Sequence, residues 1–130
     1  MKKILICDDS SFMRSIIRKT IESLKEYEVI GEAQDGIEAV SKYNELYPDI
    51  VFMDITMPKV DGLEALRKIM KYDKNAKVIM CSAMGQKDFI NEAVKIGAKD
   101  FVVKPFTAEL IGDKLKRLWL KLTPMFIAIL

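Results

Sequence analysis

Five polar residues follow short apolar runs of the chain, and their types suit the chemistry of a metal-bound phosphoryl group. Asp8 and Asp9 follow the first run, Asp54 the third, Ser82 the fourth and Lys104 the fifth. Three carboxylates in one crevice repel each other, and they stay ionised together only if a cation lies between them or protons bind. Because these residues offer oxygen ligands and no thiolate or imidazole, they favour a hard divalent ion, Mg²⁺ or Mn²⁺.

The amine and the hydroxyl in this set suit a phosphoryl group. Lys104 is a compact cation that can meet a bound phosphoryl charge, and the Ser82 hydroxyl can donate a hydrogen bond to the same group. The chain contains no histidine, which excludes imidazole bases, Ser-His-Asp triads and histidine metal sites. Asp54 is therefore better suited to accept an activated phosphoryl group as a nucleophile than to serve in an acid–base pair.

Each of these residues also has an ordinary explanation when it is taken alone. An Asp-Asp pair is often a solvated turn, and either Ser10 or Ser11 would cap a helix beginning there. Most lysines are surface charges, and a serine after a strand is commonly a turn former. The functional interpretation therefore depends on the elements that bring the five residues together.

Short β-branched runs alternate five times with longer segments of helical period. The predicted strands are Lys3–Cys7, Val29–Ala33, Ile50–Met53, Val78–Cys81 and Phe101–Val103. The predicted helices carry apolar stripes at Met13, Ile16, Ile17, Thr20, Ile21 and Leu24; at Ile37, Val40 and Tyr43; at Leu63, Leu66, Ile69 and Met70; at Phe89, Ile90, Ala93 and Val94; and at Ile111, Leu115, Leu118 and Leu122. Strands that are continuous apolar runs are typical of a parallel sheet covered on both faces.

This alternation predicts an α/β fold with five βα units. Right-handed crossovers in a chain of this size favour a doubly wound, flavodoxin-like parallel sheet with strand order 2-1-3-4-5. In such sheets ligands bind at the carboxyl ends of the strands, which is where the five polar residues stand. The topology therefore predicts that they converge on one rim.

Composition limits the class of protein. The 130 residues favour a single domain over residues 1–122, followed by an apolar tail over residues 123–130. The net charge of +2 is too close to neutral for a dedicated nucleic-acid or anionic-membrane surface. The apolar run Leu122–Leu130 is far shorter than the roughly 18 to 20 residues that a membrane span needs. Without an export signal, and with Cys7 and Cys81 in separate apolar runs, we expect a cytoplasmic protein.

Four segments resemble the receiver domain of two-component response regulators, in the order of that family. They are Leu5–Ser10, Phe52–Pro58, Val78–Met84 and Gly97–Phe106. The resemblance extends from about residue 3 to about residue 120 and is strongest to the single-domain chemotaxis regulators, chiefly in Asp54–Pro58 and Cys81–Gln86.

The resemblance implies a phosphorylation switch and not an enzyme that turns over a free substrate. Asp54 would accept a phosphoryl group from the phosphohistidine of a sensor kinase of the CheA type. Asp8, Asp9, Asp54 and the backbone carbonyl of Thr56 would hold Mg²⁺, while Ser82 and Lys104 would contact the phosphoryl oxygens. Ser82 and Phe101 would form the switch, and the Lys104-Pro105 peptide bond would be cis.

The implied partners are the sensor histidine kinase, the flagellar motor switch protein and a phosphatase. A stand-alone phosphorelay intermediate, or a receiver with another protein target, is the alternative. Two residues depart from the usual pattern: Ser82 stands where many receivers have Thr, and Phe101 where the chemotaxis members often have Tyr. The first change keeps the hydroxyl, whereas the second removes any hydrogen bond from a phenol to a partner.

The chain end is much more apolar than a solvated terminus. Pro124 should end the last helix near Leu122 and leave Met125–Leu130 free of charge. This segment either folds back on its own domain or mediates self-association, and a linker to a missing output domain is a third interpretation.

Two other function classes fit the residues less well. A phosphoaspartyl hydrolase of the haloacid dehalogenase type needs Asp-x-Asp, but here the span is Asp54-Ile55-Thr56 and lacks the second carboxylate. A flavodoxin-like cofactor module needs a neutral phosphate loop after the first strand, where Asp8 and Asp9 would repel the phosphate.

Overall fold

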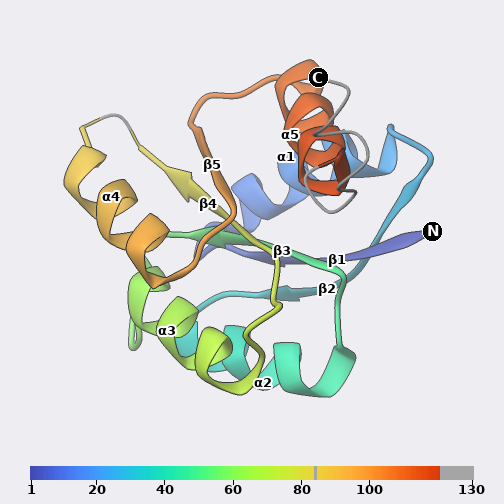
Figure 1. Cartoon of the computed structure of the whole chain (residues 1–130). Coiled ribbons are helices and arrows are strands. Elements are labelled where there is room, and N and C mark those ends of the chain that lie inside the picture. The colour runs from blue at the N-terminus through green and yellow to red at the C-terminus, as the bar shows by residue number, and fades with distance from the viewer. Residues whose placement is uncertain (84, 121–130) are drawn as a thin grey trace.

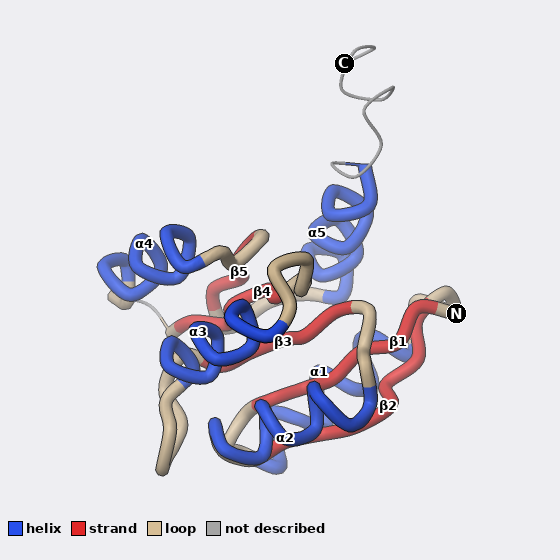
Figure 2. Tube along the Cα trace, turned by 60° about the horizontal axis from the view of Figure 1, so that its bottom comes forward, coloured by secondary structure: helices blue, strands red, loops and turns tan. Residues whose placement is uncertain are grey.

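A five-stranded parallel sheet lies between two layers of helices (Figure 1). The computed structural model describes residues 1–83 and 85–120. The elements are β1 (Lys2–Cys7), α1 (Ser11–Glu22), β2 (Tyr27–Ala33), α2 (Gly36–Leu46), β3 (Ile50–Asp54), α3 (Gly62–Tyr72), β4 (Val78–Ser82), α4 (Lys87–Ile96), β5 (Asp100–Val103) and α5 (Ala108–Leu120). The strand order is β2-β1-β3-β4-β5, and Figure 2 shows β2 and β5 at the two edges. The predicted fold and strand order are confirmed.

The sheet buries apolar side chains on both of its faces. One core packs β1, β3 and β4 against α2, α3 and α4, and the other packs the sheet against α1 and α5. Every residue of β3 and β4 is buried, Asp54 and Ser82 included. This explains why the central strands are continuous apolar runs in the sequence and do not alternate with polar residues.

In three helices the predicted apolar stripe includes residues that are exposed to solvent in the structure. Ile16 in α1, Ile37 in α2, and Phe89 and Val94 in α4 are exposed, the last two by 50% and 54%. In α4 only Ile90 and Ala93 are buried, because this helix lies at the sheet edge and covers it with one narrow face. The strands are also one or two residues longer than predicted. Leu122, Pro124 and the tail over residues 123–130 lie outside the described residues.

Four helices begin at polar residues that cap them, and in α5 the cap is Thr107, whose Oγ1 accepts from Leu110 N at 3.1 Å. Ser10 Oγ accepts a hydrogen bond from Met13 N at 3.2 Å, so Ser10, and not Ser11, caps α1. The side chains of Asp35 and Asp61 cap α2 and α3 in the same way. Such caps satisfy backbone N–H groups that the helix itself leaves without partners. They fix where each helix leaves the rim of the sheet.

The start of α3 and the end of β3 lie in contact at Gly62. A Cβ atom on this glycine would overlap the backbone carbonyl oxygen of Asp54. The Gly62 N–H donates to the carbonyl oxygen of Ile55 at 2.7 Å, which holds the two segments together. The approach needs glycine because backbone atoms, unlike a flexible side chain, cannot turn away from an added methyl group. Gly62 therefore helps to set the position of Asp54.

We predict that Gly62→Ala destabilises the fold by about 2 kcal/mol or more, because the added methyl must displace the β3 backbone at Asp54. The matched control is Gly112→Ala in α5, where the new Cβ would lie 3.6 Å from Leu24 Cδ2, an ordinary contact. Replacing glycine inside a helix should leave stability unchanged or raise it by about 0.5 to 1 kcal/mol. Urea denaturation measures both variants, and equal stabilities would show that the approach at Gly62 is not constrained.

Candidate functional site

The carboxyl ends of the four strands β1, β3, β4 and β5 bring the predicted polar residues together. Strand register pairs Cys7 with Met53, Asp54 with Cys81, and Ser82 with Val103, so these strands end at one edge. Carboxylate oxygens of Asp8, Asp9 and Asp54 all lie within 4.8 Å of one another. Asp8 and Asp54 are buried, whereas Asp9 is exposed. The rim therefore carries an acidic cluster, called the acidic crevice below, that is buried at Asp8 and Asp54 and exposed to solvent at Asp9.

Lys104 extends from the end of β5 into this crevice. Its Nζ lies 2.7 Å from Asp8 Oδ2 and 3.5 Å from Asp54 Oδ2, and its backbone N–H donates to the Ser82 carbonyl oxygen at 2.8 Å. One ammonium beside three carboxylates leaves an excess of two negative charges when all are ionised. That excess equals the charge of one divalent cation, and the all-oxygen donor set suits Mg²⁺.

The charges of the crevice change the titration of its groups. The pKa of Asp54 is raised to about 6, mainly because the carboxylate is buried; Lys104 opposes the increase, and the charges of Asp8 and Asp9 add to it. Burial alone would lower the pKa of Lys104, but its hydrogen bond to Asp8 and the nearby carboxylates raise it above the ordinary value. Without a further cation the crevice does not hold all its negative charge easily.

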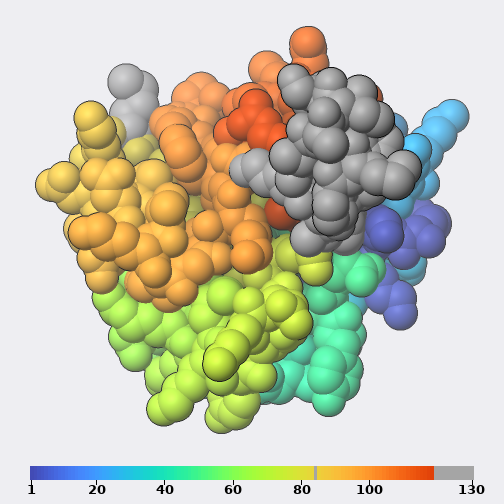
Figure 3. Space-filling model, viewed as in Figure 1, coloured from blue at the N-terminus to red at the C-terminus, as the bar shows by residue number. Residues whose placement is uncertain are grey.

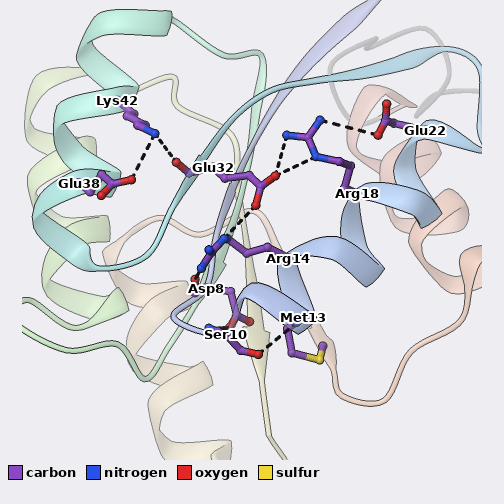
Figure 4. Close-up of polar contacts among 9 residues, drawn as sticks. All are labelled: Asp8, Ser10, Met13, Arg14, Arg18, Glu22, Glu32, Glu38 and Lys42. Atoms are coloured by element: carbon purple, nitrogen blue, oxygen red, sulfur yellow. Dashed lines mark hydrogen bonds and ion pairs between the residues drawn. The ribbon is translucent and has the colours of Figure 1, made fainter.

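Asp8 is held by a polar network that the sequence analysis did not predict (Figure 4). Its Oδ1 accepts from Ser10 N at 2.9 Å, and its backbone oxygen accepts from an Arg14 Nη atom at 2.7 Å. Arg14 and Arg18 both bind the carboxylate of Glu32, with Nε–oxygen distances of 2.9 and 2.8 Å. Although burial opposes it, these hydrogen bonds lower the pKa of Glu32. The network ties the Asp8 turn to α1 and β2.

Ser82 is 1% exposed, and its hydroxyl has no hydrogen-bond partner within residues 1–83 and 85–120. Because its hydroxyl is not used by another described residue, Ser82 can donate a hydrogen bond to a ligand at this rim. Thr56 is exposed and follows Asp54 by two residues. Its hydroxyl accepts from Gln86 Nε2 at 3.0 Å, and Gln86 Oε1 accepts from Ala83 N at 2.7 Å. The sequence analysis missed this role of Gln86.

Phe101 lies at the surface of β5 with 36% of its area exposed. Lys114 Nζ lies 5.2 Å from the centre of its ring and 2.9 Å from Asp100 Oδ1. A cation at this distance attracts the face of an aromatic ring. Phe101 also borders a cavity of about 500 Å³, mostly lined by residues of the β4–α4 loop and α4. The side chain is thus an aromatic with room beside it and not a core residue.

Two further predicted features lie near the crevice. The Lys104-Pro105 peptide bond is cis. Cys7 and Cys81 are buried free thiols, and burial raises the pKa of both above the ordinary value. Neutral thiols inside the core are poor metal ligands. The oxygen donors of Asp8, Asp9 and Asp54 are therefore the groups that fit a cation.

Comparison with known proteins places this geometry in a family. A family model for the response regulator receiver domain matches residues 4–116. The chain is 54% identical to the chemotaxis protein CheY of Listeria monocytogenes over 90% of this chain and 98% of that protein. It is also 54% identical to CheY of Thermotoga maritima over 89% and 96%.

Solved structures agree with the sequence relatives. The Borrelia burgdorferi CheX–CheY–BeF3–Mg complex contains a chain with a TM-score of 0.84 and 40% identity, covering 91% of this chain and 89% of that one. The receiver domain of Thermotoga maritima CheB gives a TM-score of 0.82 and 37% identity, covering 91% and 96%. The matched residues 4–116 contain Asp8, Asp9, Asp54 and Lys104, and the chain belongs to the response regulator receiver domain family, where it is similar to CheY over most of its length.

Proposed function

We propose that this CheY-like receiver is a cytoplasmic, Mg²⁺-dependent switch that accepts a phosphoryl group on Asp54 from a CheA-like histidine kinase. The observation that carries the proposal is the crevice in which Asp8, Asp9 and Asp54 face the ammonium of Lys104. Phosphorylation would change the affinity of the protein for the flagellar motor switch. The chain would be a signalling switch that catalyses only its own phosphorylation and dephosphorylation.

The residues present fit a magnesium ion. Asp8, Asp9 and Asp54 would hold it together with the backbone carbonyl of Thr56, and Mn²⁺ would suit the same oxygen ligands. When bound, the metal supplies positive charge for the oxygens of a transferring phosphoryl group. The solved CheX–CheY complex from Borrelia burgdorferi contains Mg²⁺ and BeF3, and this similarity supports the assignment.

Asp54 would act as the nucleophile. One of its carboxylate oxygens would form the new bond to phosphorus as the bond from phosphorus to the histidine nitrogen breaks, and the electron pair would leave with the imidazole. Lys104 already lies 3.5 Å from Asp54 Oδ2, so its ammonium can remain beside the phosphoryl oxygens. The Ser82 hydroxyl, buried and without a described partner, would donate to another phosphoryl oxygen.

The switch would connect this site to the surface at β5. Ser82 would move toward the phosphoryl group, and Phe101 would turn inward into the vacated space. The cavity beside Phe101 is lined by Ser82 as well, which supports a coupled movement of the two side chains. A phosphatase would be a further partner, and self-association would involve residues 123–130, which lie outside the described residues.

We predict that Asp54→Asn abolishes phosphorylation by acetyl phosphate, because the amide removes the nucleophile. Intact-mass spectrometry after incubation with acetyl phosphate and Mg²⁺ measures the effect. The matched control is Asp113→Asn, which changes an exposed aspartate of α5 and should be phosphorylated like the wild type. Chelating Mg²⁺ should also prevent labelling of the wild type. Normal phosphorylation of Asp54→Asn would show that the acceptor is misassigned.

The raised pKa of Asp54 predicts a pH-dependent loss of stability in the metal-free protein. The pKa is about 6 in the folded state against an ordinary 3.8, so the folded state binds more protons between these values. The unfolding free energy therefore falls as pH rises through this window, by on the order of 2 kcal/mol from this group. In EDTA, Asp54→Asn should gain stability relative to the wild type between about pH 4 and pH 7. A difference that stays constant across this range in urea denaturation would contradict the shift.

We predict that activation strengthens binding to the amino-terminal peptide of the flagellar motor switch protein. With Mg²⁺ and beryllofluoride, a mimic of the phosphoryl group, affinity should rise roughly tenfold in a fluorescence anisotropy titration. Asp54→Asn provides the control, because it should show no increase. If the wild type binds in neither state, the protein has another target or acts as a phosphorelay intermediate.

A further inference from the structure

Two loops border the acidic crevice, and the side chain of Gln86 joins them. The β3–α3 loop (residues 55–61) contains Thr56, and the β4–α4 loop (residues 83–86) contains Ala83 and Gln86 itself. Gln86 Nε2 donates to Thr56 Oγ1 at 3.0 Å, and Gln86 Oε1 accepts from Ala83 N at 2.7 Å. Among the hydrogen bonds of the described residues, this is the only side-chain link between the two loops. One amide therefore forms a bridge that joins the loop that follows Asp54 to the loop that follows Ser82.

The start of α4 has no side-chain cap. Gln86 is the N-cap residue of α4 and makes no side-chain capping hydrogen bond, whereas Ser10, Asp35 and Asp61 cap α1, α2 and α3. An uncapped first turn has backbone N–H groups without helical partners, so it is less firmly held than a capped one. The hydrogen bonds of Gln86 to Thr56 and Ala83 therefore restrain the first turn of α4, which has no side-chain cap of its own.

The bridge lies where the proposed phosphorylation would act. Ala83, whose N–H binds Gln86, directly follows Ser82, whose hydroxyl would donate to a phosphoryl oxygen on Asp54. Thr56, whose hydroxyl receives the other end of the bridge, would supply a backbone carbonyl to the metal. Because Ala83 is bonded to Ser82, a displacement of Ser82 toward Asp54 would shift the Ala83 N–H from which Gln86 Oε1 now accepts. A bridge matched to the resting position of Ala83 would then break or re-form, so its present contacts would favour the unphosphorylated arrangement.

We propose that Gln86 is a positioning residue that latches the β4–α4 loop to Thr56 in the unphosphorylated protein and is released when Asp54 is phosphorylated. The proposal rests on the proposed function of Asp54. The latch stabilises the resting state and so reduces the fraction of molecules in the active conformation. The apparent affinity for a phosphoryl group or its mimic falls in proportion to that fraction. Gln86 acts through Ser82 and Thr56 and does not itself contact the reacting atoms.

The first test is a calorimetric titration of beryllofluoride in the presence of saturating Mg²⁺. Gln86→Ala should bind about threefold tighter than the wild type, since one exposed hydrogen-bonded bridge is lost from the resting state only. Thr56→Val, which removes the accepting hydroxyl and keeps the backbone carbonyl, should show a similar gain. The double variant should bind no tighter than either single one, because both changes break the same link. Gln34→Ala, at an exposed glutamine outside these loops, should match the wild type.

The second test observes the latch directly by nuclear magnetic resonance. The chain has two glutamines, Gln34 and Gln86, so their side-chain amide signals can be assigned by substitution. In the resting protein the Gln86 Nε2 proton donated to Thr56 should exchange with solvent more slowly than the amide protons of exposed Gln34, and on addition of beryllofluoride and Mg²⁺ this difference should disappear. This readout does not depend on the stability of any variant.

Unchanged or weaker beryllofluoride binding by Gln86→Ala, or a gain in the double variant equal to the product of the single gains, would overturn the latch while leaving the proposed function intact. A Gln86 amide that stays protected in the activated protein would overturn it as well. If the wild type binds no beryllofluoride, the proposed function fails, and the latch fails with it.

Discussion

Repulsion among three carboxylates dominates the carboxyl edge of this sheet. Asp8 and Asp54 are buried there beside Asp9, and the ammonium of Lys104 offsets only part of their charge. Taking ionised groups out of water is expensive unless opposite charge compensates them, and here the compensation is incomplete. The raised pKa of Asp54 expresses that imbalance. A site with this excess charge is suited to a divalent cation and to the phosphoryl chemistry that such a cation supports.

Much of the surrounding structure serves to hold these like charges together. The parallel sheet places β1 and β3 side by side, so the Asp8 turn and Asp54 end at the same level. Arg14 donates a hydrogen bond to the backbone oxygen of Asp8 and is held in place by its ion pair with Glu32. The missing side chain of Gly62 lets the first residue of α3 contact the carbonyl oxygen of Asp54. On the face of the sheet opposite α1, Arg67 of α3 pairs with Glu92 of α4 at 2.8 Å, and in Figure 3 the residues of these two helices form neighbouring areas of the surface. Contacts on both faces of the sheet thus connect the helices that surround the rim.

The features that the sequence predicts best are those that depend on short-range pattern. Apolar runs predict all five strands, and right-handed crossovers favour the flavodoxin-like strand order, which places Asp54 and Lys104 on one rim. Longer polar contacts were not predictable. Gln86 and Thr56 are 30 residues apart in the sequence, and no pattern of apolar residues predicts the hydrogen bond between their side chains. The exposure of Phe89 was not predicted. Helical spacing shows which apolar residues lie on one side of a helix, but it does not show how much of that side the sheet covers.

The most direct test of the account is to trap the phosphorylated residue chemically. After reaction with acetyl phosphate, reduction with borohydride converts an aspartyl phosphate to homoserine, which peptide mass spectrometry locates in the chain. The account predicts conversion at Asp54 alone, and only when Mg²⁺ is present. Conversion at Asp8 or Asp9, or Mg²⁺-independent conversion at Asp54, would contradict the assignment of the acidic crevice as a metal-dependent phosphorylation site.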